Sequence, residues 1–231
     1  MKFGLKGRHV AILAADGVDG AQVGGARTAL SEAGVVADVL ATRGGEVTAA
    51  AGDAVGVDRT FDVCHSADYD ALVIPGGQAA VDALRREGRA LQFVREFMAA
   101  DKPVAAIGDG VRMLVAADAV AGRSVAAPRE LADAVREAGG ELVDRPLYVD
   151  EKLITARGEG DLSELNTAIV REFSNRVDEA RVDQLSEQSF PASDPPPGPV
   201  AVGGEGASTS LHLDPNRSEA ADGSADQRGR P

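Results

Sequence analysis

The sequence predicts an α/β fold in which a mostly parallel, doubly wound sheet is covered by helices on both faces. Short apolar runs alternate with longer segments whose apolar residues recur at helical spacing. Turns that contain glycine follow most of the apolar runs. Hydrophobic residues make up 44% of the 231 residues, which is enough for a buried core. We therefore predict one such domain over residues 1–182, followed by a separate tail over residues 183–231.

The first elements of the domain follow from residues 7–40. His9–Ala14 is an apolar run typical of a buried parallel strand, and Asp16-Gly17 ends it. Ala21–Ala33 has helical spacing up to Gly34, and glycine commonly ends helices. Val35–Leu40 is the second predicted strand.

The same two patterns predict the remaining elements. In chain order they are a loose hairpin within Gly52–Phe61, a strand at Ala71–Ile74, helices at Gln78–Arg86 and Ala90–Ala100, a strand at Val104–Ile107, a helix through Met113, Leu114 and Ala117, a strand at Ser124–Ala126, a helix at Arg129–Ala138, a hairpin of Leu147–Val149 with Leu153–Thr155, and a last helix capped by Asp161. Strands that alternate with helices in this way favour parallel pairing.

A binding pocket is expected where the predicted strands end. Ligands of doubly wound sheets bind at the carboxyl ends of the strands. Four turns stand at such ends in this sequence: Asp16-Gly17, Pro75-Gly76-Gly77, Gly108-Asp109-Gly110 and Ala156-Arg157-Gly158. We predict a pocket lined by Asp16, Gly17, Gln22, Gly76, Gly77, Gly108, Asp109 and Arg157, and a small molecule as its ligand.

Charge and composition exclude several classes of function. The formal charge is −13 and aromatic residues are only 3%, so neither a nucleic acid nor an anionic membrane is an expected partner. Cys64 is the only cysteine, and the three histidines are not at metal-binding spacing, so no disulfide, metal or cofactor is expected. The sequence has no run resembling a signal peptide or a membrane span, and we expect a cytoplasmic protein.

The composition changes near residue 183. Residues 183–231 hold seven of the eleven prolines, with eight acidic against three basic residues. Large apolar side chains are few there. Such a segment cannot bury enough apolar surface to fold, so we predict a disordered acidic tail.

Four segments, in chain order, carry a resemblance to a known family. AADGVDGAQVGGARTALSEAG, YDALVIPGG, KPVAAIGDGVRMLVAA and LITARGEGDLSELN resemble the ThiJ/PfpI family of the class I glutamine-amidotransferase-like superfamily. The resemblance implies a flavodoxin-like sandwich and a homo-oligomer. It also implies a nucleophilic cysteine at a strand-to-helix elbow, a glutamate from the first loop beside it, and backbone N–H groups that form an oxyanion hole.

The two reactive groups of that family are replaced in this sequence. Its AICHG segment corresponds to Ala106–Gly110, so Gly108 stands at the position of the nucleophile and Asp109 at that of the following histidine. Gln22 stands at the position of the glutamate. Glycine has no nucleophilic side chain, and glutamine cannot accept a proton at neutral pH. We therefore expect a non-catalytic, stress-related protein that binds a small molecule or a partner, or supports an oligomer. The oxyanion-hole backbone of Gly76, Gly77 and Asp109 is expected to remain.

An enzyme is the alternative, and it would need an unusual nucleophile. Asp109, or a water held by Asp109 and Arg157, would serve a protease- or amidase-like hydrolase or a glyoxalase- or deglycase-like enzyme. The sequence is also similar to the carboxy-terminal domain of large-subunit catalases, at Val57–Phe61 and Tyr69–Gly77. That domain has the same fold without a working elbow cysteine, which agrees with the first expectation.

Several residues with reactive or charged side chains have both a structural and a functional interpretation. We expect Cys64, beside His65, to be an ordinary structural thiol, because it precedes a strand instead of following one. Asp109 is expected to stabilise a helix start, and Asp16 and Asp19 to be solvated, with a shared cation site as the alternative. Arg157 pairs with Asp109, binds an anionic ligand or forms a salt bridge at the rim; these stay open.

Overall fold

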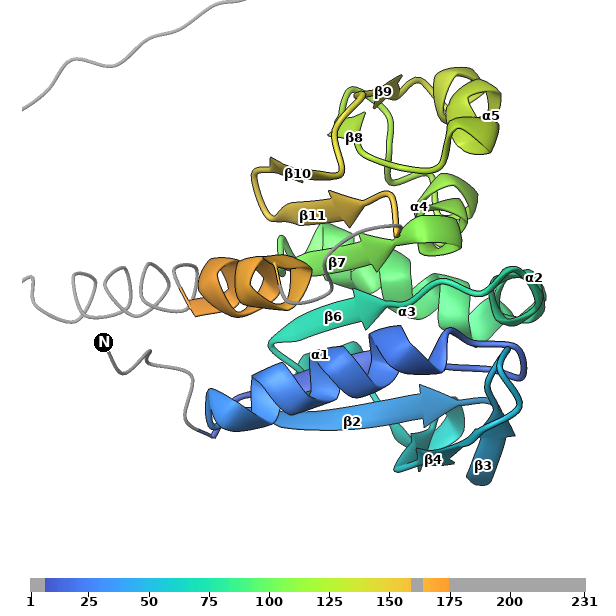
Figure 1. Cartoon of the computed structure of the whole chain (residues 1–231), viewed down its shortest axis with the longest axis vertical. Coiled ribbons are helices and arrows are strands. Elements are labelled where there is room, and N and C mark those ends of the chain that lie inside the picture. The colour runs from blue at the N-terminus through green and yellow to red at the C-terminus, as the bar shows by residue number, and fades with distance from the viewer. Residues whose placement is uncertain (1–6, 159–163, 175–231) are drawn as a thin grey trace, which may run out of the picture. The chain divides into compact units, whose positions relative to one another are not determined.

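The computed structural model of this chain describes residues 7–158 and 164–174. These residues belong to the first of two compact units, Met1–Pro191. Their central feature is a seven-stranded sheet (Figure 1). In spatial order its strands are β10 (Leu147–Asp150), β11 (Leu153–Ala156), β7 (Val104–Ile107), β6 (Ala71–Ile74), β1 (His9–Leu13), β2 (Val36–Ala41) and β5 (Arg59–Thr60).

All neighbours in this sheet pair in parallel except β10 and β11, which form an antiparallel hairpin. The predicted fold class is therefore confirmed. The strands β1, β6 and β7 come from continuous apolar runs, and β6 and β7 are buried along their whole lengths. Continuous apolar runs suit these strands because helices cover both faces of a doubly wound sheet.

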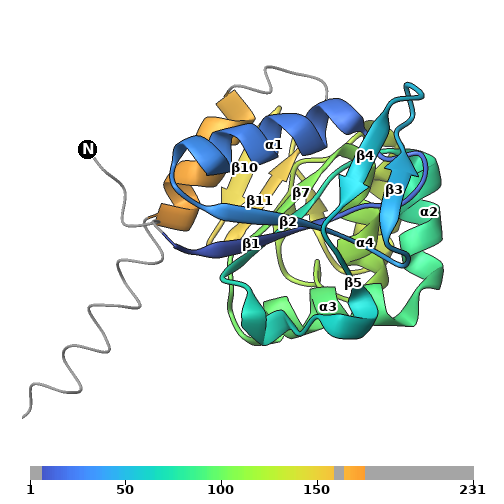
Figure 2. The same cartoon turned by 90° about the horizontal axis from the view of Figure 1, so that it is seen from below.

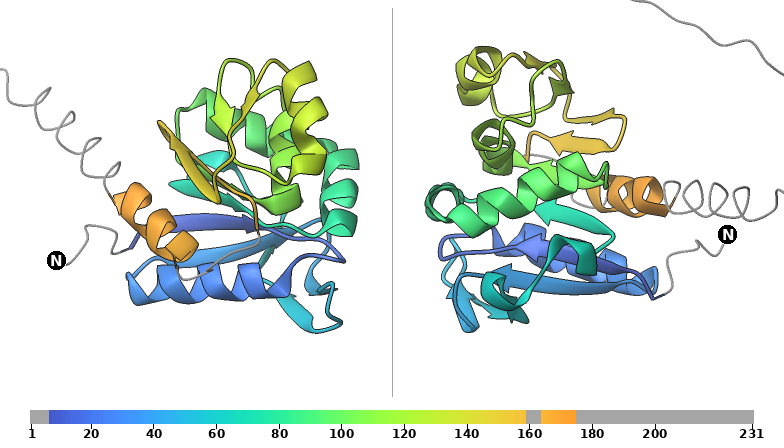
Figure 3. Two further views of the ribbon diagram at one scale, coloured as in Figure 1. Left: turned by 45° about the horizontal axis from the view of Figure 1, so that its top comes forward. Right: turned by 180° about the vertical axis from the view of Figure 1, so that it is seen from behind.

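Helices cover the two faces of the sheet. Figure 2 shows α1 (Gly20–Glu32) on one face and α3 (Gly88–Ala99) on the other. The helical residues 164–174 lie beside α1 (Figure 3). The helices α2 (Gln78–Arg86) and α4 (Val111–Ala116) pack against α3. The strands β1, β6 and β7 all end at the same edge of the sheet, and each is followed there by the start of a helix, α1, α2 and α4 respectively.

The start of α1 is set by its own sequence. The side chain of Asp19 accepts a hydrogen bond from the backbone N–H of Gln22 at 3.1 Å, which satisfies one of the free donors at the helix start. The helix buries Val23, Ala26 and Leu30, as its spacing predicts. This capping fixes Gln22 in the first turn, close to the strand ends.

The face under α3 holds a cluster of aromatic rings. The ring centroid of Phe93 lies 6.2 Å from that of Phe61, 6.0 Å from that of Tyr69 and 5.2 Å from that of Phe97. The ammonium group of Lys102 stands 5.3 Å above the Phe97 ring and donates to two backbone carbonyls. These contacts join α3 to the segment before β6.

Two predicted strands differ from the structure. The hairpin predicted within Gly52–Phe61 begins earlier, because β3 (Gly45–Thr48) pairs with β4 (Ala54–Val57) outside the main sheet. The segment Ser124–Ala126 forms β8 (Ser124–Val125), which pairs only with β9 (Glu141–Leu142) and does not join the sheet. The β8–β9 pairing joins residues far apart in the chain, so the local pattern could not show it, and β3 (GEVT) has too few apolar residues to be recognised as a strand.

The predicted helix at Arg129–Ala138 is a short 3₁₀ turn followed by α5 (Ala132–Glu137). The predicted cap Asp161 and the acidic tail over 183–231 lie outside the described residues. Within the described ranges, no helix is long and apolar enough to cross a membrane.

Candidate functional site

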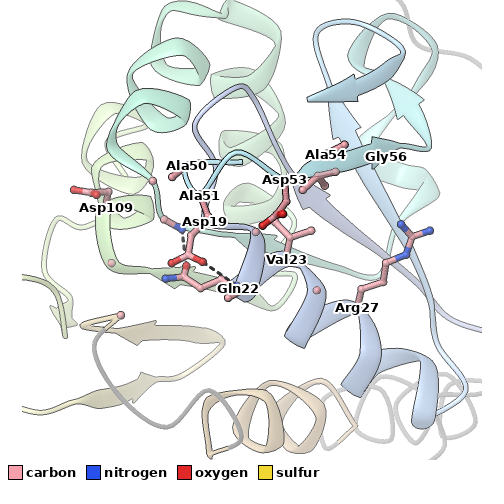
Figure 4. A pocket seen from close by; sticks show the side chains of 18 of the residues that line it. Asp19, Gln22, Val23, Arg27, Ala50, Ala51, Asp53, Ala54, Gly56 and Asp109 are labelled. Atoms are coloured by element: carbon pink, nitrogen blue, oxygen red, sulfur yellow. Dashed lines mark hydrogen bonds between the residues drawn. The ribbon is translucent and has the colours of Figure 1, made fainter. Parts of the chain in front are cut away.

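A cavity of about 890 Å³ opens at the carboxyl ends of β6, β7 and β11 (Figure 4). Its other walls are the first turns of α1 and the turn between β3 and β4. Six of the eight predicted pocket residues line it, namely Gln22, Gly76, Gly77, Gly108, Asp109 and Arg157. Asp16 and Gly17 are not among the lining residues.

Gly108 forms the elbow between β7 and the turn that leads into α4. Its φ of +57° is the conformation that residues with a side chain rarely adopt. A Cβ built there would meet the carbonyl oxygen of Arg157 at 3.7 Å and the Cα of Gly158 at 3.8 Å, which are ordinary contact distances. The elbow therefore has the space for a side chain, although the positive φ would strain one, and it presents no reactive atom.

The turn after β6 interlocks with the loop after β1. Gly77 has a φ of +106°, and a Cβ on it would overlap the carbonyl oxygen of Gly17. The carbonyl oxygen of Gly76 accepts a hydrogen bond from the backbone N–H of Asp19 at 3.0 Å. Gly17 thus has a packing role beneath the turn, which explains why it does not face the cavity.

Gln22 joins α1 to the same turn. Its Oε1 accepts a hydrogen bond from the backbone N–H of Gly76 at 2.7 Å, and the residue is only 5% exposed. This bond defines which end of the carboxamide is oxygen. The Nε2 consequently points away from Gly76 N, toward the side of the cavity on which Asp109 lies (Figure 4).

Asp16 contributes to the neighbouring hairpin instead of the cavity. Its carboxylate accepts hydrogen bonds from the backbone N–H of Thr48 at 2.9 Å and from the guanidinium of Arg43 at 2.8 Å. The Thr48 N–H, and then Arg43, hold the pKa of Asp16 below its usual value. In the described part of the chain no three carboxylate, histidine or cysteine side chains are grouped to hold a metal ion, so the alternative cation site is not seen.

Arg157 forms the rim salt bridge, one of the three arrangements considered for it. Its Nη2 donates to Oδ1 of Asp144 at 2.5 Å, and it is not paired with Asp109. Asp109 lies in the first turn after the elbow and is partly buried. None of the described residues forms a hydrogen bond or ion pair with its carboxylate.

Cys64 is buried away from the cavity, in the segment between two 3₁₀ turns before β6. It is 1% exposed, and its Sγ lies 3.5 Å from the hydroxyl of Tyr69, which donates to Asp38 at 3.1 Å. Burial, and then the contact with Cys64, raises the pKa of Tyr69 far above its ordinary value. This thiol packs as a core side chain and does not stand where it could act on a ligand of the cavity.

The outer wall of the cavity was not predicted. The turn between β3 and β4 supplies Ala50 and Asp53, β4 supplies Gly56, and α1 supplies Arg27 (Figure 4). The guanidinium of Arg27 pairs with Asp58 at 3.1 Å. Gly52, with its positive φ, lies in this turn, and a glycine is a common sequence signal of a turn.

Comparisons with known proteins agree with this architecture. A family model described as the DJ-1/PfpI family matches residues 8–172. A protein/nucleic acid deglycase of Escherichia coli is 36% identical over 118 residues, which cover 51% of this chain and 68% of that protein. A deglycase of Thermococcus kodakarensis is 32% identical over 164 residues, covering 71% of this chain and 96% of that protein.

A solved structure shows the same fold at similar identity. A two-domain protein from Anabaena variabilis, with DJ-1/ThiJ/PfpI-like and ferritin-like domains, matches with a TM-score of 0.68 and 32% identity. The match covers 71% of this chain and 47% of that protein, so this chain spans about half of its length. The family model extends over nearly all the described residues, from β1 to the helical residues 164–174. The chain belongs to the DJ-1/PfpI family.

Proposed function

We propose that this protein is a non-catalytic member of its family that binds a small molecule in the cavity above Gly108. The observation that carries the proposal is the elbow itself. Gly108 keeps the positive φ and the free space of a nucleophile position, yet no thiol, hydroxyl or amine stands there. The lone cysteine is buried elsewhere. A cavity with this shape can hold a ligand without forming a covalent bond to it.

A Gly108→Cys variant tests whether the elbow still favours an anion. The new thiol faces the cavity, and the Nε2 of Gln22 lies on the same side, so a hydrogen bond stabilises the thiolate. We expect iodoacetamide labelling across a pH series to give a thiol pKa clearly below about 8.5. The unchanged protein serves as the blank, because its own Cys64 is buried.

Gly56→Cys is the matched control for that labelling. Gly56 lies in β4 at the other end of the cavity, and a Cβ there meets nothing within 4 Å. Its thiol is expected to titrate near about 8.5, like a free cysteine. Equal titration of both variants would mean that the elbow gives an anion no special stabilisation.

A deglycase-like enzyme is the second candidate. It is supported by the names of the two relatives and by Asp109, a partly buried carboxylate on the cavity wall. The purified chain is nevertheless expected to consume methylglyoxal no faster than buffer, since glycine replaces the nucleophile. A rate above buffer that falls by about a hundredfold in Asp109→Asn would instead establish a catalytic carboxylate. Asp53→Asn, on the opposite wall, is the control for a general loss of charge.

A further inference from the structure

We propose that Arg157 and Arg129 together hold a dianionic phosphate group of the ligand, in the place that Asp144 occupies in the free chain. The inference rests on the proposed binding function and adds the chemistry of one group of the ligand. It starts from an unsatisfied donor. Among the described residues, the Nε of Arg157 is the buried side-chain nitrogen or oxygen that lacks a hydrogen-bond partner. A buried donor on a charged group is costly to leave unpaired, so a better partner would change this conformation of Arg157.

Asp144 is an imperfect partner for Arg157. Its Oδ1 accepts from one nitrogen of the guanidinium, Nη2, at 2.5 Å. Its Oδ2 accepts from Nη2 of Arg129 at 3.4 Å, so the two arginines share this carboxylate. The Asp144 side chain is 71% exposed, and exposed ion pairs of this kind add little to stability. Asp144 can therefore leave both arginines at little cost, and the guanidinium of Arg157 is then free to turn its Nε toward a ligand.

The charges at this corner of the cavity do not balance. Among the ion pairs of the described residues, Arg129 and Arg157 have one carboxylate between them, which leaves one positive charge. A dianionic phosphate would balance both guanidinium groups, whereas a carboxylate would only replace Asp144. The planar guanidinium can also donate from Nε and one Nη to two oxygens of the same phosphate. The buried donor of Arg157 would then have a partner.

The two arginines border the cavity. Arg157 lines it, and Arg129 directly follows Pro128, which is also a lining residue. The backbone N–H of Arg157 donates to the carbonyl oxygen of Pro146 at 2.9 Å, so its main chain is held in place. Binding of a phosphate group therefore requires a movement of side chains and not of the strand end.

The carboxylates of the cavity lie mainly at its other end. Asp53 belongs to the turn between β3 and β4, and Asp19 caps α1, which follows β1. In the sheet, β6 and β7 separate β1 from β11, the strand that precedes Arg157. The third carboxylate, that of Asp109, is directed away from Asp19 and forms no ion pair with Arg157 (Figure 4). The β11 end of the cavity is thus its basic end, in a chain whose net charge is −13.

The test is an NMR titration of the ¹⁵N-labelled full chain with methyl phosphate and methyl sulfate at constant ionic strength. The two probes have the same shape, but at about pH 7.5 the phosphate is mostly a dianion and the sulfate is a monoanion. Methyl phosphate is expected to shift the Nε–H signal of Arg157 and the backbone amides of Gly108 and Gly158 along one saturable curve. Methyl sulfate is expected to bind about tenfold more weakly. Equal binding of the two probes would overturn the assignment of a dianion.

Inorganic phosphate is the third probe, and it distinguishes two sources of the same group. Weaker binding than that of methyl phosphate would support an organic phosphate ester as the ligand, since the ester group adds contacts in the cavity. Equal binding would support the free ion. Both results require the two arginines.

Asp144→Asn is the sharpest variant, because it removes the carboxylate that competes with the ligand. We expect methyl phosphate to bind about fivefold more tightly to it. Asp133→Asn makes the same change of charge in an exposed pair with Arg136 on α5, outside the cavity, and should alter the affinity by less than about twofold. Unchanged or weaker binding by Asp144→Asn would mean that Asp144 supports the site instead of occupying it, and would overturn the inference.

Variants of the arginines test the two donors directly. Arg157→Gln should weaken binding of methyl phosphate by at least about tenfold, the loss typical of hydrogen bonds to a charged group. Arg157→Lys keeps the charge without the planar fork and should recover only part of that loss. Arg129→Gln should cost about threefold, because Arg129 is the more exposed of the two. Arg27→Gln, which changes the arginine at the other end of the cavity, should bind normally.

Failure of the inference and failure of the proposed function give different results. If methyl phosphate produces no saturable shifts, or binds equally well to Arg157→Gln, the phosphate site is wrong although the cavity can still bind another molecule. If the chain consumes methylglyoxal faster than buffer, the proposed non-catalytic function is wrong, whichever anion binds.

Discussion

Gly77→Ala is expected to cost roughly 2–6 kcal/mol of stability, combining backbone strain with overpacking. The φ of +106° is unfavourable for alanine, and its Cβ would overlap the Gly17 carbonyl oxygen and lie 2.9 Å from Val18 Cα and Asp19 N. All three are parts of the backbone, so no side chain can rotate to make room. The loop after β1 must move, and Asp19 and Gln22 move with it. Urea denaturation measures the free energy of unfolding.

Gly24→Ala is the matched control for that substitution. Gly24 lies inside α1, and a Cβ on it meets nothing within 4 Å. Alanine there should stabilise the protein by about 0.5–1 kcal/mol, because glycine is a poor residue inside a helix. A Gly77→Ala protein as stable as the unchanged chain would mean that the loop after β1 and the turn after β6 are not packed as described.

Phe97→Ala should destabilise the protein by about 3–5 kcal/mol. Phe97 belongs to α3, and its ring is fully buried, lies tilted against the ring of Phe93 and carries the ammonium of Lys102 above its face. Its loss leaves a cavity on the side of the sheet opposite α1. Thermal and chemical unfolding both measure the change.

Val63→Ala provides the comparison for Phe97→Ala, since Val63 lies in the 3₁₀ turn Phe61–Val63 that contacts α3 but is 66% exposed. It should change stability by no more than about 0.5 kcal/mol. Below its unfolding transition, Phe97→Ala should leave the NMR amide signals of Gly76, Gly108 and Gly158 unchanged, because Phe97 does not line the cavity. Shifted signals from these glycines in a protein that remains folded would show that the aromatic cluster also shapes the site.

The sequence predicted the central strands well because burial on both faces leaves a local signal. β1, β6 and β7 come from apolar runs that any partner strand could bury, and their ends necessarily meet at one sheet edge. That is why Gly76, Gly108 and Arg157, far apart in the chain, could be assigned to one place. The early start of β3 and the separate pairing of β8 with β9 have no comparable signal, since each depends on a partner strand.

The orientation of single charged side chains was less predictable. Asp16 follows a strand end, as a pocket residue should. Its carboxylate nevertheless accepts hydrogen bonds from Arg43 and from the Thr48 N–H of β3, and it does not line the cavity. Arg157 likewise pairs with Asp144, which no motif singled out. Such choices depend on which partner tertiary folding brings near, and neither residue type nor spacing encodes that directly.

The hairpin of β3 and β4 forms the outer wall of the cavity, and it is fastened to the rest of the domain at both ends. The backbone N–H of Ala50 donates to the Val18 carbonyl oxygen at 2.8 Å. At the other end, Asp58 binds both Arg27 of α1 and the N–H of Val39 in β2. A wall already held in place has little conformational freedom left to lose, so a ligand would not pay an entropic penalty for ordering it. Small compounds that make only a few contacts can therefore bind in such a preorganised cavity.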